Sequence, residues 1–190
     1  MAGSGQDLDV ALGAARRGDE AGLSAVYGLL GGRVAEFLRA RGAWDADGLT
    51  NEVFLAAFTG MAEFRGDADA FRGWVYTIAR NKAIDDARKR ARRPEVVAGD
   101  AEPLTVPSRH VVDDVFVHIE REWIAEQLSD LTADQRDVVV LRLIDDLSVR
   151  DVAEILDKPE EAVRSLQYRA IRQLRKKLVG DPPRPPRSVR

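Results

Sequence analysis

The fold is decided by residues 131–178, which read LTADQRDVVVLRLIDDLSVRDVAEILDKPEEAVRSLQYRAIRQLRKKL. The pattern predicts three short helices, at 132–145, 148–156 and 159–178. The last helix follows its predecessor after a turn of only two or three residues. Two amphipathic helices joined by so tight a turn are typical of a helix-turn-helix, which lays its second helix in a DNA major groove.

The final helix separates an apolar face from a basic face. Its apolar residues recur at steps of three and four, which is the spacing of a stripe that faces a core. A single basic helix is more often a merely solvated face, but the tight turn and the paired amphipathic helix favour DNA binding. The stripe consists of Val163, Leu166, Ala170, Leu174 and Leu178, and the basic set consists of Arg164, Arg169, Arg172, Arg175 and Lys176.

The turn itself carries local signals. Ser148, with Asp151 three residues later, is a candidate N-cap for the preceding helix. Asp157 is short and polar, so it tolerates turn conformations that larger residues resist. Pro159 suits the first turn of a helix, because the N–H that it lacks would have no partner there.

The charge distribution says more than the net charge. The chain has 190 residues and a net charge of −3, which by itself argues against a nucleic-acid binder. Residues 71–93 and 163–190, however, carry net charges of +6 and +8, whereas residues 1–70 and 94–162 carry −5 and −12. Two basic blocks separated by an acidic middle suggest two contact points on one polyanion.

Other features exclude several functional classes. The absence of cysteine excludes disulfides and thiolate chemistry. The first ten residues lack a signal-peptide pattern, and no apolar run approaches the ~20 residues that span a bilayer, so we expect a cytoplasmic protein that is not embedded in a membrane. His110 and His118 are the two histidines. We therefore expect no catalytic residues, no metal site, no cofactor and no enzymatic activity.

The chain is predicted to be all-α, with two small helical domains joined by a flexible linker. Further helices are expected at 8–17, 19–41, 49–64, 70–93 and 115–129, and the glycines at 28, 31 and 32 allow a break in the second of these. Prolines and a loss of periodicity mark residues 94–114 as the linker. The predicted units are an N-terminal domain at 1–93, the linker, a helix-turn-helix domain at 115–178 and a Pro/Arg-rich tail at 179–190.

Residues 71–93, FRGWVYTIARNKAIDDARKRARR, form a second concentrated signal. Aromatic side chains beside basic ones suit unpaired bases, because the ring stacks on a base while the cation neutralises phosphate. The polar loop at 65–69 is suited to hold a base turned out of the stack. Trp74 is more often a core residue than a stacking platform, and both readings stay open. The more exposed set is predicted to be Arg72, Tyr76, Arg80, Asn81 and Arg88.

Together these segments resemble the bacterial RNA polymerase sigma factors of the extracytoplasmic-function (ECF) group. The segment LTNEVFLAAF at 49–58 resembles the helix that docks on the polymerase clamp. Residues 64–90 resemble the segment that melts and reads the minus-ten element, and residues 131–178 resemble the domain that reads the minus-thirty-five element. The resemblance implies a dissociable subunit that binds the core polymerase (β′ clamp and β flap) and promoter DNA. It also implies an anti-sigma factor as regulator.

The resemblance assigns roles to individual residues. Those expected to bind the core polymerase are Leu49, Glu52, Val53 and Phe54. Those expected at the minus-ten element are Arg65, Asp67, Arg72, Trp74, Tyr76, Arg80, Asn81 and Arg88. Those expected at the minus-thirty-five element are Arg164, Ser165, Tyr168, Arg169 and Arg172.

Several positions depart from the family pattern. Gly48 and Asn51 stand where an acidic residue and glutamine are frequent, Asp157 occupies the usual turn glycine, and Pro159 replaces a Ser or Thr cap. An alternative is a helix-turn-helix regulator that acts without polymerase, with residues 1–93 serving for ligand sensing or dimerisation. A second alternative is an interaction protein that keeps the fold and has lost promoter activity.

Overall fold

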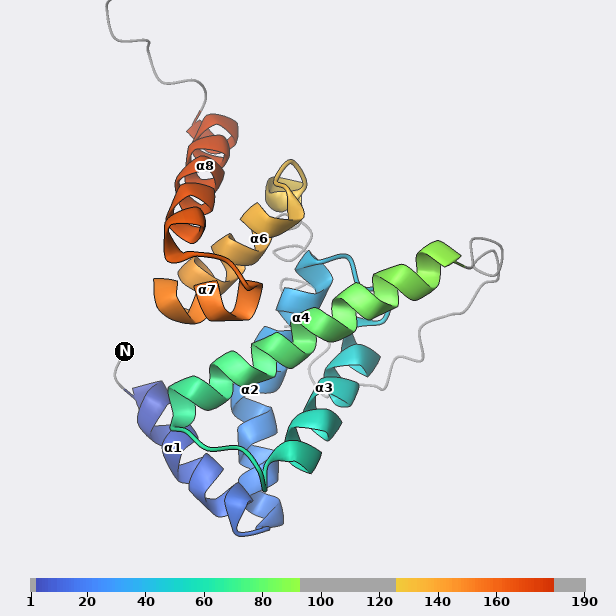
Figure 1. Cartoon of the computed structure of the whole chain (residues 1–190), viewed down its shortest axis with the longest axis vertical. Helices are drawn as coiled ribbons and strands as arrows, with labels where there is room; N and C mark the ends of the chain where they lie inside the picture. The colour runs from blue at the N-terminus through green and yellow to red at the C-terminus, as the bar shows by residue number, and fades with distance from the viewer. Residues whose placement is uncertain (1–2, 93–125, 180–190) are drawn as a thin grey trace, which may run out of the picture.

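The computed structural model describes residues 3–92 and 126–179, and in those ranges it contains helices and no strand. The all-α prediction is confirmed. The N-terminal part consists of α1 (Gly3–Arg16), α2 (Glu20–Ala40), α3 (Ala46–Gly60) and α4 (Ala68–Arg92). The C-terminal part consists of α6 (Ala133–Val139), the π-helical turn η1 (Val140–Ile144), α7 (Val149–Leu156) and α8 (Glu160–Val179). Figure 1 shows α1 to α4 as one bundle, with α6, α7 and α8 grouped above α2 and α4.

Two predicted segments fall largely or wholly outside the described residues. Of the helix expected at 115–129, residues 126–129 are described, and 126–128 are helical. The linker expected at 94–114 and nearly all of the tail lie outside the described ranges.

The glycines of α2 do not break the helix. Asp19 caps its first turn by accepting a hydrogen bond from the Ala21 N–H at 2.9 Å, and the helix then continues to Ala40. Gly22 lets α2 approach α1 closely, because a Cβ at this position would lie 2.4 Å from the Ala15 backbone nitrogen. The penalty of glycine in a helix is thus offset by tertiary packing.

The helix expected at 132–145 divides into α6 and η1. It begins with a capping box, in which the side chain of Thr132 and that of Gln135 each accept a backbone N–H at the other residue. It then widens, and the Asp145 N–H donates to the Val140 carbonyl, five residues back, at 3.0 Å. This wider turn sets the position of Asp145, which is buried. Such π turns frequently accompany functional sites.

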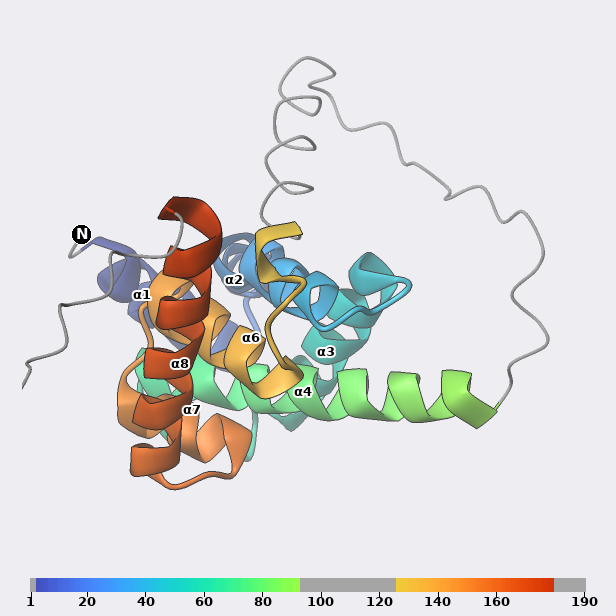
Figure 2. The same cartoon turned by 90° about the horizontal axis from the view of Figure 1, so that it is seen from above.

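A single hydrophobic cluster extends through both parts of the chain. It includes Phe37, Phe54 and Phe71 from the N-terminal bundle and Leu141, Leu147 and others from the C-terminal helices. The α4 helix packs against α7, and α2 contacts α6 and η1. Figure 2 shows the C-terminal half of α4 extending well beyond α7. The two predicted domains are therefore packed against each other.

Candidate nucleic-acid interface

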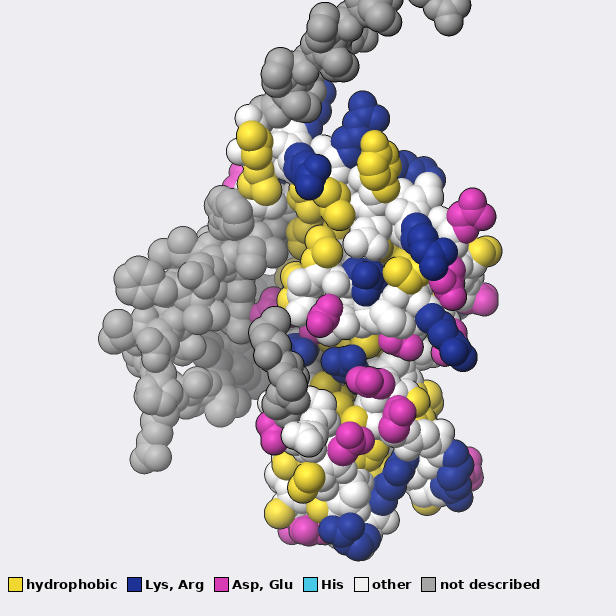
Figure 3. Space-filling view, turned by 90° about the vertical axis from the view of Figure 1, so that its left-hand side faces the viewer, with side chains coloured by type: hydrophobic (Ala, Val, Ile, Leu, Met, Phe, Trp, Pro, Cys, Tyr) yellow, Lys and Arg dark blue, Asp and Glu magenta, His cyan; other side chains and the backbone are white. Residues whose placement is uncertain are grey.

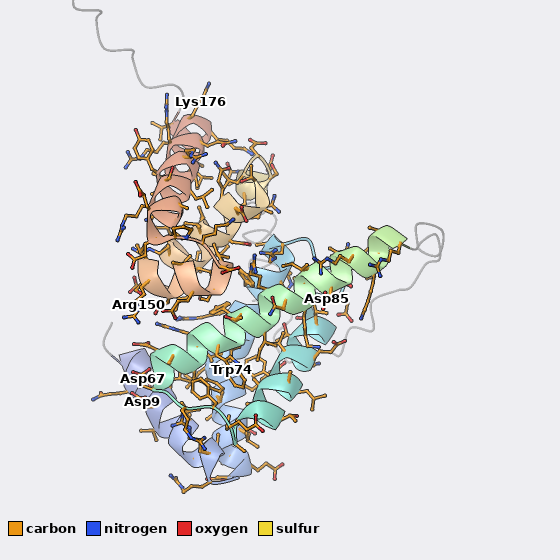
Figure 4. All side chains as sticks on the ribbon, viewed as in Figure 1. Asp9, Asp67, Trp74, Asp85, Arg150 and Lys176 are labelled. Atoms are coloured by element: carbon orange, nitrogen blue, oxygen red, sulfur yellow. The ribbon has the colours of Figure 1, made fainter. Side chains whose placement is uncertain are left out.

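The α8 helix presents the predicted basic face to solvent. Val163 and Ala170 of its apolar stripe are fully buried, and Leu166 and Leu174 pack on the core from partly buried positions. Arg164, Arg169 and Arg172 are exposed, Ser165 is half-buried, and Tyr168 is 69% exposed. Lys and Arg side chains gather at the upper end of the face shown in Figure 3, and Lys176 projects from the upper end of α8 in Figure 4.

Two of these arginines already have partners on their own helix. Arg164 Nη2 lies 2.5 Å from Glu160 Oε2, and Arg169 Nη2 donates to Ser165 Oγ at 2.8 Å. Both contacts are at the surface and link residues four apart, so each stabilises the helix only weakly. A competing anion can therefore replace them at little cost.

The turn between α7 and α8 follows the local signals in the sequence. The Ser148 side chain accepts the Asp151 N–H at 3.1 Å, and the Asp151 side chain accepts the Ser148 N–H at 3.1 Å, which completes the predicted cap. Asp157 ends α7 in the left-handed conformation, with φ of 51°. Pro159 lies one residue before α8, and its carbonyl accepts the Val163 N–H. Figure 4 shows Arg150 at the start of α7.

Arg142 joins η1 to the helix-turn-helix, and the sequence reasoning missed it. Its guanidinium donates to the Leu147 carbonyl, just before α7, and to Gln167 Oε1 of α8 at 3.5 Å. One side chain thus links the start of α7 to the side of α8. No sequence motif singles it out, because the contact spans 25 residues.

The loop between α3 and α4, residues 61–67, is held by α1. Arg16 donates to the Gly66 carbonyl at 2.6 Å, and Asp9 accepts the Ala68 N–H at 3.1 Å. Asp67 caps the first turn of α4 by accepting the Ala70 N–H, and Figure 4 shows Asp9 and Asp67 side by side. Gly66 adopts φ of 152°, a value that side chains disfavour. Arg65 is exposed and donates to the Ala62 carbonyl at 2.7 Å.

Trp74 lies in an aromatic cluster on the inner side of α4. Its ring stacks on Phe64 at a centroid distance of 5.0 Å and meets Phe71 edge-on at 5.8 Å. Figure 4 shows Trp74 directed toward the bundle. In this structure the core alternative therefore describes Trp74 better than a stacking platform for bases.

The C-terminal part covers much of the predicted exposed set on α4. Tyr76 is 1% exposed, and its hydroxyl donates to Asp145 Oδ2 at 2.5 Å. Arg72 is mostly covered and Arg80 is half-buried, whereas Asn81 and Arg88 remain exposed. The expectation that Tyr76 lies at the surface is wrong, because its ring packs edge-on against Phe37 of α2 at a centroid distance of 5.4 Å and its hydroxyl bonds Asp145.

The α3 helix divides its predicted docking residues between core and surface. Val53 and Phe54 are buried, so the expectation that they offer a docking surface is wrong in this structure. They pack α3 into the core of the bundle. Leu49 is half-buried, and Glu52 is exposed. A hydrogen bond from Lys82, at 2.8 Å, lowers the pKa of Glu52. Leu55, which the sequence analysis did not single out, is 69% exposed on the same helix.

Among residues 3–92 and 126–179 there is no group of three or more His, Cys, Asp or Glu side chains placed to hold a metal ion. No helix in the described part of the chain is long and apolar enough to cross a membrane.

Comparison with known families identifies both parts of the chain. Residues 24–93 match the family model Sigma-70 region 2, and residues 127–176 match Sigma-70, region 4. These two regions define a sigma-70-type transcription factor.

Curated relatives show to which group of sigma factors the chain is similar. The sigma-E factor of Haemophilus influenzae is 32% identical over 143 residues, which cover 70% of this chain and 75% of that protein. SigW of Bacillus subtilis is 33% identical over 145 residues, which cover 70% of this chain and 75% of that protein. BldN of Streptomyces coelicolor is 32% identical over 145 residues, but the match spans only 55% of its length. The chain belongs to the ECF family of RNA polymerase sigma factors.

Solved structures share the fold. CnrH, in complex with the cytosolic domain of CnrY, aligns with a TM-score of 0.65 at 24% identity over 93% of this chain and 100% of that chain. RpoE of Bartonella quintana, in complex with the anti-sigma factor NepR, aligns with a TM-score of 0.58 at 22% identity over 93% of this chain and 97% of that chain.

Proposed function

We propose that this sigma factor binds core RNA polymerase and directs promoter-specific initiation, with α3, α4 and α8 as its three working surfaces. The observation that carries the proposal is the presence of a region 2 bundle and a region 4 helix-turn-helix in one chain, each with a basic helix. Phosphate neutralisation supplies the affinity for DNA, and a few base contacts supply the selection. The polymerase performs the chemistry, and the chain itself catalyses nothing.

The exposed face of α8 is the proposed reader of the minus-thirty-five element. Arg164, Tyr168 and Arg172 lie four residues apart and form one exposed row along the helix. Ser165 and Arg169 flank that row. Arginine pairs with guanine edges in the major groove, and hydroxyl groups accept several partners. The buried positions of Val163 and Ala170 support this orientation.

The minus-ten element is proposed to contact α4 and the loop before it. Arg65, Asp67, Asn81 and Arg88 are exposed and accessible to DNA. Arg72 and Arg80 are only partly accessible, and Tyr76 is buried between Phe37 and Asp145. Trp74 contributes by holding the loop through Phe64.

Core polymerase is proposed to dock on the exposed side of α3. Glu52 and Leu55 lie on this side, and Leu49 is half-buried at its edge. Asn51 accepts a hydrogen bond from the Tyr27 hydroxyl at 2.8 Å, which orders the same face. Val53 and Phe54 fix the position of the helix from the core.

We also propose an anti-sigma factor as a partner and the cytoplasm as the location. Two structural neighbours were solved as complexes, RpoE with an anti-sigma factor and CnrH with a cytosolic domain. The domain limits proposed from the sequence, 1–93 and 115–178 with the linker between them, contain both family matches.

The helix-turn-helix regulator that acts without polymerase has less support. That alternative requires residues 1–93 to be a sensing or dimerisation domain, whereas residues 24–93 match sigma region 2. Run-off transcription on genomic fragments, with purified core enzyme and with or without the chain, tests the proposal. Products that require both components are expected, and their absence with a demonstrably active core would contradict the proposed function.

A further inference from the structure

Two charged side chains of α1 hold the backbone of the α3–α4 loop, residues 61–67. Arg16 Nη2 donates to the Gly66 carbonyl at 2.6 Å, and Asp9 Oδ1 accepts the Ala68 N–H at 3.1 Å. The two contacts lie on either side of Asp67 along the chain. They join residues 50 and 59 positions apart, so the tertiary packing of α1 beside α4 brings them together.

Arg16 also connects the loop to the aromatic cluster of α4. Its guanidinium carbon lies 5.5 Å from the centroid of the Phe64 ring, and Phe64 in turn stacks on Trp74. A cation near an aromatic ring and a charge-assisted hydrogen bond to a carbonyl are both favourable. One arginine therefore fixes the loop at its backbone and at its aromatic side chain.

The loop is closely packed around Gly66. A Cβ at this position would lie 2.8 Å from Ala70 Cβ and 3.0 Å from Phe64 Cζ. Asp67 is turned back toward α4, because it accepts the Ala70 N–H at 2.9 Å, and Figure 4 shows it beside Asp9. The N–H groups of Gly66 and Asp67 form no hydrogen bond within residues 3–92 and 126–179, so they are donors that the fixed loop offers to a base or phosphate.

We propose that Asp9 and Arg16 are positioning residues for the minus-ten reader: α1 holds the α3–α4 loop in the conformation that captures an unpaired base. The inference rests on the proposed role of this loop at the minus-ten element. A loop that is ordered before binding loses less conformational entropy when a base enters it. The α1 helix therefore contributes to base selection through the loop, without contacting DNA itself.

Both side chains can be replaced without disturbing the core. Asp9 and Arg16 are exposed, whereas α1 packs on the bundle through Leu8, Leu12 and Ala15. Substitutions of exposed side chains usually change the free energy of unfolding only slightly. A loss of base selection in these variants therefore reports on the loop and not on unfolding.

The sign of the Asp9 effect separates positioning from electrostatics. Asp9→Ala removes a negative charge, which by itself favours binding to DNA. Loss of the hydrogen bond to Ala68 is expected to weaken binding instead. Asp7→Ala is the matched control, because Asp7 is exposed on the same helix and the charge change is identical. Asp9→Asn keeps an oxygen for the Ala68 N–H and is expected to retain the wild-type selection.

Base selection is measured on the full chain assembled with purified core polymerase, with core alone as the background. The probe is single-stranded DNA with a randomised stretch, and sequencing of the bound fraction identifies the preferred base. Fluorescein-labelled oligonucleotides with and without that base then give the affinities. Asp9→Ala and Arg16→Ala are each expected to bind the preferred oligonucleotide about tenfold more weakly, which corresponds to about 1.4 kcal/mol. Arg16→Lys is expected to recover part of this loss, and Arg17→Ala is the exposed control.

Trp74 reports on the loop in the absence of DNA. Trp44→Phe and Trp123→Phe leave it as the one tryptophan of the chain, and its ring stacks on Phe64 of the loop. In this background Asp9→Ala and Arg16→Ala are expected to raise the quenching of Trp74 by acrylamide above the level of Asp7→Ala.

The proposal requires both changes. Wild-type base selection in Asp9→Ala and Arg16→Ala would overturn it. A loss of selection with unchanged Trp74 quenching would also overturn it, because the two side chains would then act on DNA directly. If the wild-type chain with core selects no base, the minus-ten role of the loop fails, and run-off transcription shows separately whether the chain directs initiation.

Discussion

Arg164 and Arg169 are the residues whose replacement most directly tests the minus-thirty-five surface. Arg164→Ala or Arg169→Ala is expected to weaken binding to a cognate upstream duplex by about 1–3 kcal/mol, because each removes a charged contact to a base edge or phosphate. Fluorescence anisotropy at several salt concentrations measures the loss. Arg17→Ala, an exposed site on the other domain, is the control. Transcription from a cognate promoter at the wild-type rate in both variants would contradict the assignment of α8.

Phe54 and Leu55 are neighbours with opposite environments. Phe54→Ala is expected to lower the free energy of unfolding by about 3–5 kcal/mol, because it empties a core site beside Tyr27 and Phe58. Leu55→Glu is expected to change the unfolding free energy by only about 0.5 kcal/mol, since the side chain is exposed. Denaturant titration measures both changes.

Leu55→Glu is also expected to weaken binding to core polymerase, because it places a charge in an apolar part of the proposed docking face. A pull-down with purified core enzyme measures this loss, and Ser24→Glu on the exposed side of α2 is the control. If Leu55→Glu binds the core as tightly as Ser24→Glu does, that face of α3 is not the docking surface.

At the scale of single elements, the α7–α8 turn depends on Asp157 in a left-handed conformation. Glycine adopts this conformation without steric cost, whereas the Cβ of alanine makes the same conformation unfavourable. We expect the stability order Asp157→Gly above wild type above Asp157→Ala, with steps of about 1 kcal/mol. Thermal unfolding of the three proteins measures this order. An alanine variant as stable as the glycine variant would show that the backbone conformation at this turn is not left-handed in solution.

The helices and turns also show why the features that depend on neighbouring residues were predicted correctly. Helix spacing, the Ser148 cap and the turn at residue 157 depend on contacts within four residues, so they can be read from the sequence. The division of the helix at 132–145 into α6 and η1 was missed, because no local sequence signal marks the wider turn that accompanies the burial of Leu141 and Asp145. The α3–α4 loop was identified, but its fixation by Asp9 and Arg16 depends on residues about fifty positions away.

At the scale of the whole molecule, the contact between the regions is expected to depend on pH. Burial raises the pKa of Asp137 to about 6, an effect that Arg41 opposes, with Asp134 and Arg80 also nearby. Burial likewise raises the pKa of Asp145, which faces Tyr76, Arg33 and Arg72. Packing of the two regions against each other therefore takes up protons, so it is favoured as the pH falls through about 6.

Energy transfer between dyes on Glu63→Cys in the α3–α4 loop and Arg175→Cys on α8, followed from about pH 7.5 down to about pH 5, measures this dependence. Transfer is expected to rise as the pH falls. Asp137→Asn, which resembles the protonated form, is expected to reduce the pH response. A wild-type signal that stays constant or falls over this range would contradict the prediction.

The sequence by itself determined the all-α class, the two sigma regions, the helix-turn-helix and the basic face of α8. These features follow from residue spacing, local capping and charge, all of which act over short distances along the chain. Only the tertiary structure decided which of the residues predicted to contact promoter DNA or the polymerase are exposed. Tyr76, Val53 and Phe54 are buried because side chains distant in sequence pack on them, and Asp145 reaches Tyr76 across 69 positions. The most informative segment, residues 131–178, thus encodes both the basic face of α8 and, through Asp137 and Asp145, the contact with Arg41 of α2 and Tyr76 of α4.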